Sequence, residues 1–347
     1  MRVRDLRTVA PFTSLRRLGT RYLDDPRLRT LLDRYATYTG SDPRRAPAAL
    51  ATVPYVEQTF GAWYVAGGLR RLGEALHQRV LDTGASVRTG ADVTSIGLAG
   101  GRVDHVLLAD GERLPADVVV ANADAAHLYG DLVEGPQAAA ARRALARTTP
   151  SLSGFVVLLA LRGRTPGLRH HTVLFPDDYD DEFDSVFGTG PHRGRPRPVP
   201  DPTVYVSAPD DPALRPDDAH ESWFVLVNAP RHAPDDPAAG VDWDAPGLAA
   251  SYADRVLDVM AARGLDVRDR VLWREVRTPA DLARGTRAVG GSIYGTSSNG
   301  ARSAFLRPSN ASPVPGLFLV GGSAHPGGGL PLVGLSAAIV AGLVGRA

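Results

Sequence analysis

A cluster of glycines near the carboxyl end has the clearest chemical potential in this sequence. The segment Gly321-Gly322-Ser323-Ala324-His325-Pro326-Gly327-Gly328-Gly329 separates an apolar run over 317–320 from another over 330–344. Glycine lacks the Cβ atom that keeps a ligand away from the backbone, and the first turn of a helix presents N–H groups and a favourable dipole. The spacing predicts a strand, a loop and a helix whose junction suits a diphosphate or a flavin. A plain connecting loop is the alternative.

Two predicted strands would position this chemistry. The run 317–320 is apolar at every position, as in a strand that is covered on both faces of an α/β sheet. The run 118–121 has the same character and ends in the polar residues Asn122 and Asp124 before a predicted helix over 125–132. Strand ends of this kind face ligands in open α/β sheets.

The amino-terminal part predicts helices and a glycine turn. Pro26 can begin a helix over 26–38 that Gly40 ends. The run 53–63 alternates loosely and predicts a strand-like arm. This arm turns on Gly67 and Gly68 into a helix over 69–84.

Further along, the pattern changes to short strands. They are predicted over 86–88, 92–96 and 103–108, and Asp110-Gly111 predicts a hairpin turn after the third. Longer apolar runs predict strands over 151–161 and 223–227, and helical spacing predicts a helix over 251–263.

Composition excludes several classes of function. The 347 residues are enough for two domains, and 39 basic against 38 acidic residues leave a net charge of +1, so we expect no nucleic-acid partner. The absence of cysteine excludes disulfides, thiolate metal sites and a cysteine nucleophile, and it fits a reducing cytoplasm. The first residues lack the apolar core of a signal peptide. The run 330–344 is too short to span a bilayer and predicts a buried core helix.

No metal site is predicted. The acidic run Asp177-Asp178-Tyr179-Asp180-Asp181-Glu182 lacks the spacing and the glycine of a calcium loop, so we expect solvated side chains. The pair His170-His171 is expected at the surface, because neighbouring side chains of a strand point to opposite faces.

Several separated segments together resemble the bacterial phytoene desaturase-type carotenoid desaturases of the flavin amine oxidase superfamily. The segments are Asp25-Pro26-Arg27-Leu28-Arg29, the turn over 61–69, the strand end over 116–124, Gly291-Ser292-Ile293-Tyr294-Gly295, Arg307-Pro308 and the closing motif over 321–331. The version Gly328-Gly329-Leu330-Pro331-Leu332 is closer to the hydroxycarotenoid 3,4-desaturase branch.

The resemblance implies a mixed α/β fold with an incomplete Rossmann-like FAD-binding domain. A substrate domain with a mixed or antiparallel sheet and helices would accompany it. Residues 1–60 and 151–290 would form the substrate domain, and residues 61–150 and 291–347 the FAD domain. The implied activity is the FAD-dependent desaturation of a lipophilic polyene in carotenoid biosynthesis. Such an enzyme holds an apolar chain flat against the flavin and excludes water.

The resemblance also implies roles for individual residues. Val93 would place its backbone beside the adenine of FAD. The other implied cofactor-binding residues lie near the ribityl chain and flavin or begin the helix behind them: Ala121, Asn122, Gly321, Gly322, His325, Pro326, Gly327, Gly328, Pro331 and Leu335. For His325 we expect backbone contacts rather than acid–base chemistry, and no catalytic acid or base is identified.

A turn in the first third of the chain is the implied substrate contact. Trp63, Tyr64, Gly67 and Gly68 would approach the ring face of the flavin. Simple core packing is the alternative for Trp63 and Tyr64, since aromatic residues dominate cores.

One feature of the family is not found. The G-x-G-x-x-G turn that holds the FAD diphosphate does not occur after a strand here, so we expect an amino-terminally truncated chain or a separate chain that supplies this unit. The alternatives are an inactive fragment, a non-catalytic subunit, or another flavin amine oxidase-like oxidoreductase. A lipophilic substrate implies work in the cytoplasm at the surface of the cytoplasmic membrane.

Overall fold

The computed structural model describes residue 10, residues 12–300 and residues 307–345, and the chain divides into two compact units. Unit 1 comprises residues 1–59, 91–153 and 281–347. Unit 2 comprises residues 60–90 and 154–280. The expected mixed α/β fold is confirmed. The assignment of the four sequence segments to FAD and substrate domains remains a prediction.

Unit 1 begins with helices. Helix α2 spans Leu15–Tyr22, and α3 spans Pro26–Arg34 and continues as a 3₁₀ turn over Tyr35–Thr39. The carboxylate of Asp25 caps α3, and Gly40 ends the segment in the left-handed conformation at φ +60°. The helix predicted from Pro26 is therefore confirmed.

The strand predicted over 53–63 is wrong. A 3₁₀ turn over Ala48–Ala51 leads directly into helix α4, which spans Thr52–Phe60. Pro54 lies in the first turn of this helix, where its missing N–H costs no hydrogen bond, so it does not prevent helix formation. The loose alternation of apolar residues therefore does not indicate a strand here.

Two small sheets follow in unit 1. Strands β1 (Val93–Ala99), β2 (Arg102–Leu108) and β3 (Arg113–Pro115) are antiparallel. Asp110-Gly111 lies in a hairpin turn as predicted, but the strand that follows it is β3, which the sequence pattern did not indicate. Strands β4 (Val119–Ala121) and β10 (Leu317–Leu319) pair in parallel, with Leu319 opposite Ala121. Residues 86–88 form no strand, because such a short run has no neighbouring strand to pair with.

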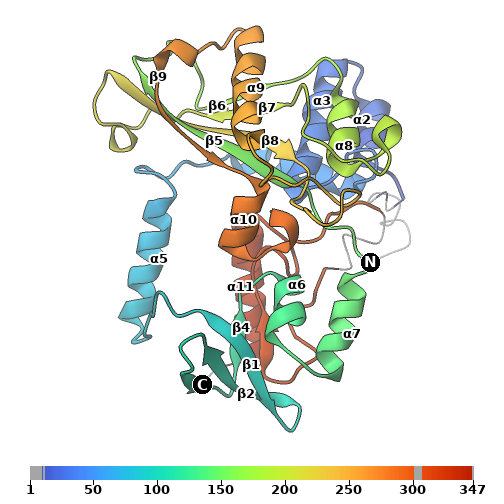
Figure 1. Ribbon diagram of the computed structural model, residues 1–347, viewed down its shortest axis with the longest axis vertical. Coiled ribbons are helices and arrows are strands. Elements are labelled where there is room, and N and C mark those ends of the chain that lie inside the picture. Colours follow the sequence, from blue (N-terminus) through green and yellow to red (C-terminus); the bar gives the residue numbers. More distant parts are fainter. Residues whose placement is uncertain (1–9, 11, 301–306, 346–347) are drawn as a thin grey trace. The chain divides into compact units, whose positions relative to one another are not determined.

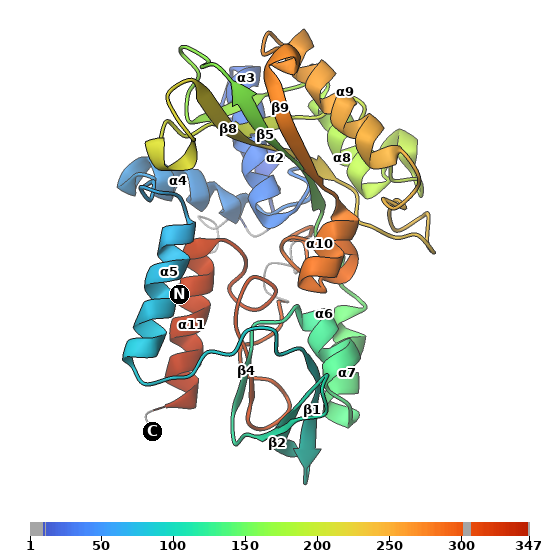
Figure 2. The ribbon, with the colours of Figure 1, turned by 60° about the vertical axis from the view of Figure 1, so that its left-hand side comes forward.

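Helices cover the antiparallel sheet of unit 1. Helix α6 (Ala125–His127) continues as a π turn over Leu128–Leu132, and α7 (Pro136–Leu145) packs against that turn (Figure 2). The core between them contains Ile96, Val103, Leu128, Tyr129, Val133, Leu317 and Leu319.

Helix α11 spans Leu330–Val344, as the sequence predicts, but it is not a buried core helix. Only Ser336 and Val340 are buried, whereas Leu335 is 55% exposed. The Ser336 hydroxyl accepts from Nδ2 of Asn310, before β10, and from the Gly321 N–H, after it, whereas most of the other residues of the helix are exposed.

Unit 2 is built on a five-stranded sheet in the order β6-β7-β8-β5-β9. The strands are β5 (Ser153–Arg162), β6 (His171–Leu174), β7 (Val204–Ser207), β8 (His220–Ala229) and β9 (Val271–Arg277). Helix α9 (Leu248–Ala262) lies across one face of the sheet (Figure 1). Phe155, Trp243 and Tyr252 pack in tilted and edge-on contacts in the core between them, with ring centroids 4.9 to 5.6 Å apart.

Three further helices belong wholly or partly to unit 2. They are α5 (Arg70–Asp82), α8 (Tyr179–Phe187) and α10 (Pro279–Thr286), which crosses the unit boundary. The acidic run starts α8, where the Asp178 carboxylate accepts from the N–H groups of Asp180 and Asp181. Asp177 and Asp178 are exposed, as expected, whereas Glu182 is fully buried. In the part of the chain that the structure describes, no helix combines the length and the hydropathy that crossing a bilayer requires.

Candidate flavin-binding loop

The ends of β4 and β10 meet at the glycine loop of unit 1. Because the two strands are parallel, their carboxyl ends lie at the same edge, and the Val320 N–H donates to the Ala121 carbonyl at 3.0 Å. Gly321 has φ +96°, and a Cβ built there would lie 2.0 Å from Oδ1 of Asn122. The structure thus brings together Ala121, Asn122 and Gly321, which the sequence placed 200 residues apart.

Two other glycines also allow close contacts. A Cβ at Gly328 would lie 2.6 Å from the ring of Tyr294, and a Cβ at Gly295, whose φ is +65°, would lie 2.7 Å from Cβ of Ser323. Glycine at these positions therefore lets the backbone pack closely against the side chains of Asn122, Tyr294 and Ser323.

Asn310 anchors the glycine loop through its side-chain amide. Its buried Nδ2 donates to the Leu319 carbonyl at 3.0 Å, to the His325 carbonyl at 2.9 Å and to Oγ of Ser336 at 2.9 Å. The same Ser336 hydroxyl accepts from the Gly321 N–H at 3.3 Å. One side chain thus joins the strand, the loop and helix α11.

Arg307 is a second anchor. Its buried guanidinium donates to the carbonyls of Tyr294 at 2.9 Å, Gly322 at 3.0 Å and Thr296 at 3.1 Å. Burial lowers the pKa of Arg307, because the charged form loses water contacts. The three carbonyl acceptors nevertheless hold the guanidinium group against the loop backbone.

The loop keeps donors available for a ligand. The backbone N–H groups of Gly322, Ser323, Gly327, Gly328 and Gly329 donate to no acceptor among the described residues. They precede the first turn of the 15-residue helix α11. N–H groups without partners at a helix start suit the oxygen-rich ribityl and phosphate groups of a flavin nucleotide, so the residues present fit FAD.

The remaining residues of the predicted cofactor set lie around this loop or in β1. His325 is fixed through its backbone, since its N–H donates to the Pro308 carbonyl at 2.9 Å and its carbonyl accepts from Asn310. Pro331 and Leu335 lie in the first turns of α11, and both are exposed. Val93 begins β1 opposite Leu108, and no hydrogen bond described in the structure joins it to the loop.

A cavity of about 330 Å³ adjoins the loop within unit 1. Its walls are largely apolar, with Leu145 and Val289 among them, and Ser323 and Asp124 contribute polar groups. Burial raises the pKa of the Asp124 carboxyl, although this carboxyl accepts from the Ala126 N–H at 2.9 Å.

The predicted substrate turn lies in unit 2. Trp63 is 91% exposed and Tyr64 is 45% exposed, so neither packs in a core. The Asp211 carboxylate accepts from the Tyr64 hydroxyl at 2.8 Å and from the Gly67 N–H at 2.6 Å. The Tyr64 ring meets His170 edge-on, with centroids 4.8 Å apart. The turn is therefore rigidly held while its aromatic faces stay accessible.

A group with metal-ligating atoms occurs elsewhere in unit 2. His232, Asp242 and Asp244 place one ligand atom each within 4.8 Å of one another. Both aspartates are exposed, and exposed acidic groups are common without an ion.

Sequence reasoning missed several supporting residues. The family motif includes Arg307 but assigns it no role, and no motif of the sequence singles out Asn310, Ser336 or Asp211. Ser336 had a usable signal, because it is the only residue with a polar side chain in the run 330–344. Asn310 and Asp211 had none, since their partners are distant in sequence or are backbone groups.

Known proteins are similar to this chain in sequence and in fold. The profile of the family described as "Flavin containing amine oxidoreductase" matches residues 7–231. Hydroxyneurosporene desaturase of Cereibacter sphaeroides is 38% identical over 97% of this chain and 65% of its own length. The 4,4'-diapolycopene oxygenase of Methylomonas sp is 33% identical over 97% of this chain and 66% of its own length. The 1-hydroxycarotenoid 3,4-desaturase of Flavobacterium sp. is 31% identical over 92% of this chain and 62% of its own length.

The chain thus spans less than two thirds of the length of these relatives. Among solved structures, an oxidoreductase from Methanosarcina mazei matches with a TM-score of 0.61 at 16% identity, over 97% of this chain and 71% of that one. Putrescine oxidase matches with a TM-score of 0.57 at 12% identity, over 98% and 69%. These two likenesses concern the fold.

Proposed function

The chain belongs to the flavin containing amine oxidoreductase family, and on this premise we propose that it binds FAD and desaturates a carotenoid precursor. The observation that carries the proposal is the loop between β10 and α11, beside the end of β4, where five N–H groups have no acceptor among the residues that the structure describes. When bound, FAD supplies the acceptor for hydrogen removed from saturated carbons.

The residues of this chain would bind and position. The N–H groups of Gly322, Ser323, Gly327 and Gly328 would hold the ribityl chain and flavin edge, and Arg307 and Asn310 keep these groups in place. Preorganised donors cost no reorganisation when the ligand arrives. The proposed roles of Ala121, Asn122, His325, Pro326, Pro331 and Leu335 follow from their places around this loop.

The substrate class rests on the relatives and on the aromatic turn of unit 2. Two of the three relatives described above are named as desaturases of hydroxylated carotenoids. The exposed rings of Trp63 and Tyr64 offer flat apolar faces to a polyene, and Asp211 holds the turn that carries them. A substrate of this kind resides in membranes, so we propose action at the cytoplasmic membrane surface.

A second candidate is oxygenation of a carotenoid. The relative from Methylomonas and a further relative from Staphylococcus haemolyticus are both named as oxygenases. The two reactions use the same class of substrate and differ in the product, which gains oxygen in one case and loses hydrogen in the other.

A third candidate is a non-catalytic role for the 347-residue chain. The exposed apolar residues Val118 and Val120 beside β10, together with Leu335 on α11, would then be covered by a separate unit that supplies the diphosphate site.

The test has two parts. The chain is purified, incubated with FAD and desalted, and the flavin absorbance that it retains is recorded. It is also expressed in bacteria that accumulate neurosporene, hydroxyneurosporene or lycopene, and the pigments are analysed by absorbance and mass. Retained flavin and a product poorer in hydrogen are the expected results. An oxygen-containing product would favour the second candidate. Absence of both flavin and product would favour the third.

A further inference from the structure

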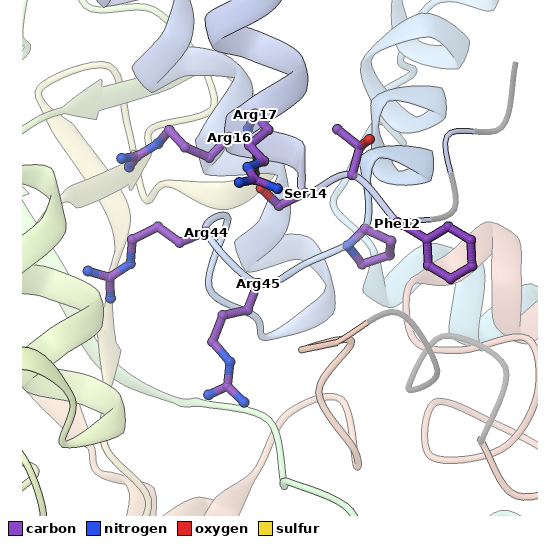
Figure 3. Close-up of a pocket in the computed structure, with 8 residues that line it drawn as sticks. Phe12, Ser14, Arg16, Arg17, Arg44 and Arg45 are labelled. Carbon is purple, nitrogen blue, oxygen red and sulfur yellow. Dashed lines mark hydrogen bonds between the residues drawn. The ribbon is translucent and has the colours of Figure 1, made fainter. Parts of the chain in front are cut away.

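A pocket of about 410 Å³ in unit 1 is lined by four arginines (Figure 3). Arg16 and Arg17 come from the first turn of α2, and Arg44 and Arg45 come from the loop over 42–47. Ser14 and Phe12 also line the pocket.

Backbone hydrogen bonds hold the two segments side by side. The Leu15 N–H donates to the Ala46 carbonyl at 2.9 Å, and the Ala48 N–H donates to the Thr13 carbonyl at 2.8 Å. The Arg16 N–H donates to the Pro43 carbonyl at 3.0 Å. These bonds fix the backbone positions from which the four arginine side chains extend.

Two of the four positive charges are compensated. Arg16 forms an ion pair with the buried Asp33, and Arg44 forms a two-pronged ion pair with the buried Asp42 at 2.8 to 3.1 Å. Arg17 and Arg45 have no ion pair or side-chain hydrogen bond with any residue that the structure describes. The pocket lining thus carries two surplus positive charges, which would attract an anion.

The amides of α2 are not the ligand-binding groups. The Leu15 and Arg16 N–H groups are used as described, and the Arg17 N–H donates to the Ser14 hydroxyl at 3.3 Å. An anion would therefore be bound by the guanidinium groups.

We propose that this pocket binds a phosphate group carried by an organic molecule, with Arg17 and Arg45 as its ligands. A guanidinium offers a planar fork of donors that matches two phosphate oxygens, and a phosphate has enough oxygens for both arginines. The cavity is larger than one inorganic phosphate ion, and Phe12, which is 88% exposed, provides an apolar contact at its edge. A phospholipid headgroup and a soluble phosphate ester share this chemistry.

The test compares a double variant with a control of equal charge. Arg17→Gln with Arg45→Gln removes the two proposed ligands, and Arg143→Gln with Arg147→Gln removes two exposed arginines in and after α7. All of these side chains are exposed, so both variants should keep the unfolding temperature of the parent chain. The probes are phosphatidylcholine vesicles with phosphatidic acid, the same vesicles with oleate in place of phosphatidic acid, and glycerol phosphate in solution.

We expect the parent chain and the α7 control to sediment with the phosphatidic acid vesicles. The Arg17/Arg45 variant should bind these vesicles at least roughly tenfold more weakly. Calorimetric binding of glycerol phosphate with the same dependence on Arg17 and Arg45 would identify a soluble ester as the source. The proposal is overturned if the parent chain binds neither phosphate probe, if oleate vesicles bind equally well, or if the control loses as much binding as the Arg17/Arg45 variant.

Discussion

Gly321 and Asn122 approach so closely that a Cβ on Gly321 would lie 2.0 Å from Oδ1 of Asn122. Gly321 follows β10 and Asn122 follows β4, so this contact joins the carboxyl ends of the two parallel strands. The floor of the proposed flavin site therefore depends on a glycine at this position.

Replacement of this glycine should damage both stability and cofactor binding. Gly321→Ala adds a Cβ at φ +96° and forces Asn122 away, which we expect to cost about 2 kcal/mol or more of unfolding free energy. Urea unfolding and retained flavin absorbance measure the two effects. The matched control is Gly334→Ala in α11, where a Cβ meets nothing within 4 Å, and where we expect a gain of about 0.5–1 kcal/mol. Equal stability of the two variants would contradict the proposed packing.

Asn310 should matter through the direction of its hydrogen bonds. Its Nδ2 faces the Leu319 and His325 carbonyls, so Asn310→Ala leaves buried acceptors unpaired and should cost about 1–3 kcal/mol. Asn310→Asp keeps the shape but directs a carboxylate oxygen at those carbonyls, and should be the more destabilising of the two at neutral pH. Chemical denaturation of both variants checks the order. If the aspartate variant proved as stable as the parent chain, the bonding assigned to Asn310 would be wrong.

The buried Glu182 should give unit 2 a distinctive pH dependence. Its carboxyl oxygens accept from the Thr203 N–H at 2.7 Å and the Asn228 Nδ2 at 2.6 Å, yet burial raises its pKa above the ordinary value of 4.5. The folded state therefore binds the proton more tightly than the unfolded state. The resulting contribution to stability is complete below pH 4.5 and is lost as pH rises through the raised pKa.

The measurement for Glu182 is the difference in unfolding free energy between the parent chain and Glu182→Gln, taken from about pH 4 to 8. The other titrating groups are common to both proteins and cancel in this difference. We expect the parent chain to lose stability relative to the glutamine variant as pH rises. A difference that stays constant with pH would show that the pKa of Glu182 is not raised.

Asp211 should control the turn that carries Trp63 and Tyr64. Removal of its carboxylate by Asp211→Ala frees the Tyr64 hydroxyl and the Gly67 N–H, so amide hydrogen exchange over 60–69 should accelerate. Asp218→Ala is the matched control, because Asp218 pairs with Arg215 and makes no bond to this turn. If the turn contacts a polyene, Asp211→Ala should also raise KM more than the control does. Unchanged exchange in Asp211→Ala would remove Asp211 as the anchor.

Local patterns determined much of the secondary structure. Asp25-Pro26 and Gly40 mark the limits of the α3 segment, Asp110-Gly111 marks the β2–β3 turn, and the glycines over 321–329 separate β10 from α11. Each of these signals acts through the backbone of the residue itself or of its immediate neighbours, so it can be read without the fold. The motifs also carried the family resemblance, which the comparisons confirmed.

Tertiary structure decided how these pieces support a site. The strand predicted over 53–63 became α4, and the acidic run became the start of α8 with Glu182 buried, because burial and long-range partners outweighed local alternation and charge. The anchoring of the loop by Asn310 and Arg307, and the gathering of Arg16, Arg17, Arg44 and Arg45, depend on hydrogen bonds between residues separated in sequence. The sequence indicated most of the elements and a glycine loop at which we propose that a ligand approaches the backbone. Only the packing of distant segments decided which polar groups are satisfied and which remain free to bind.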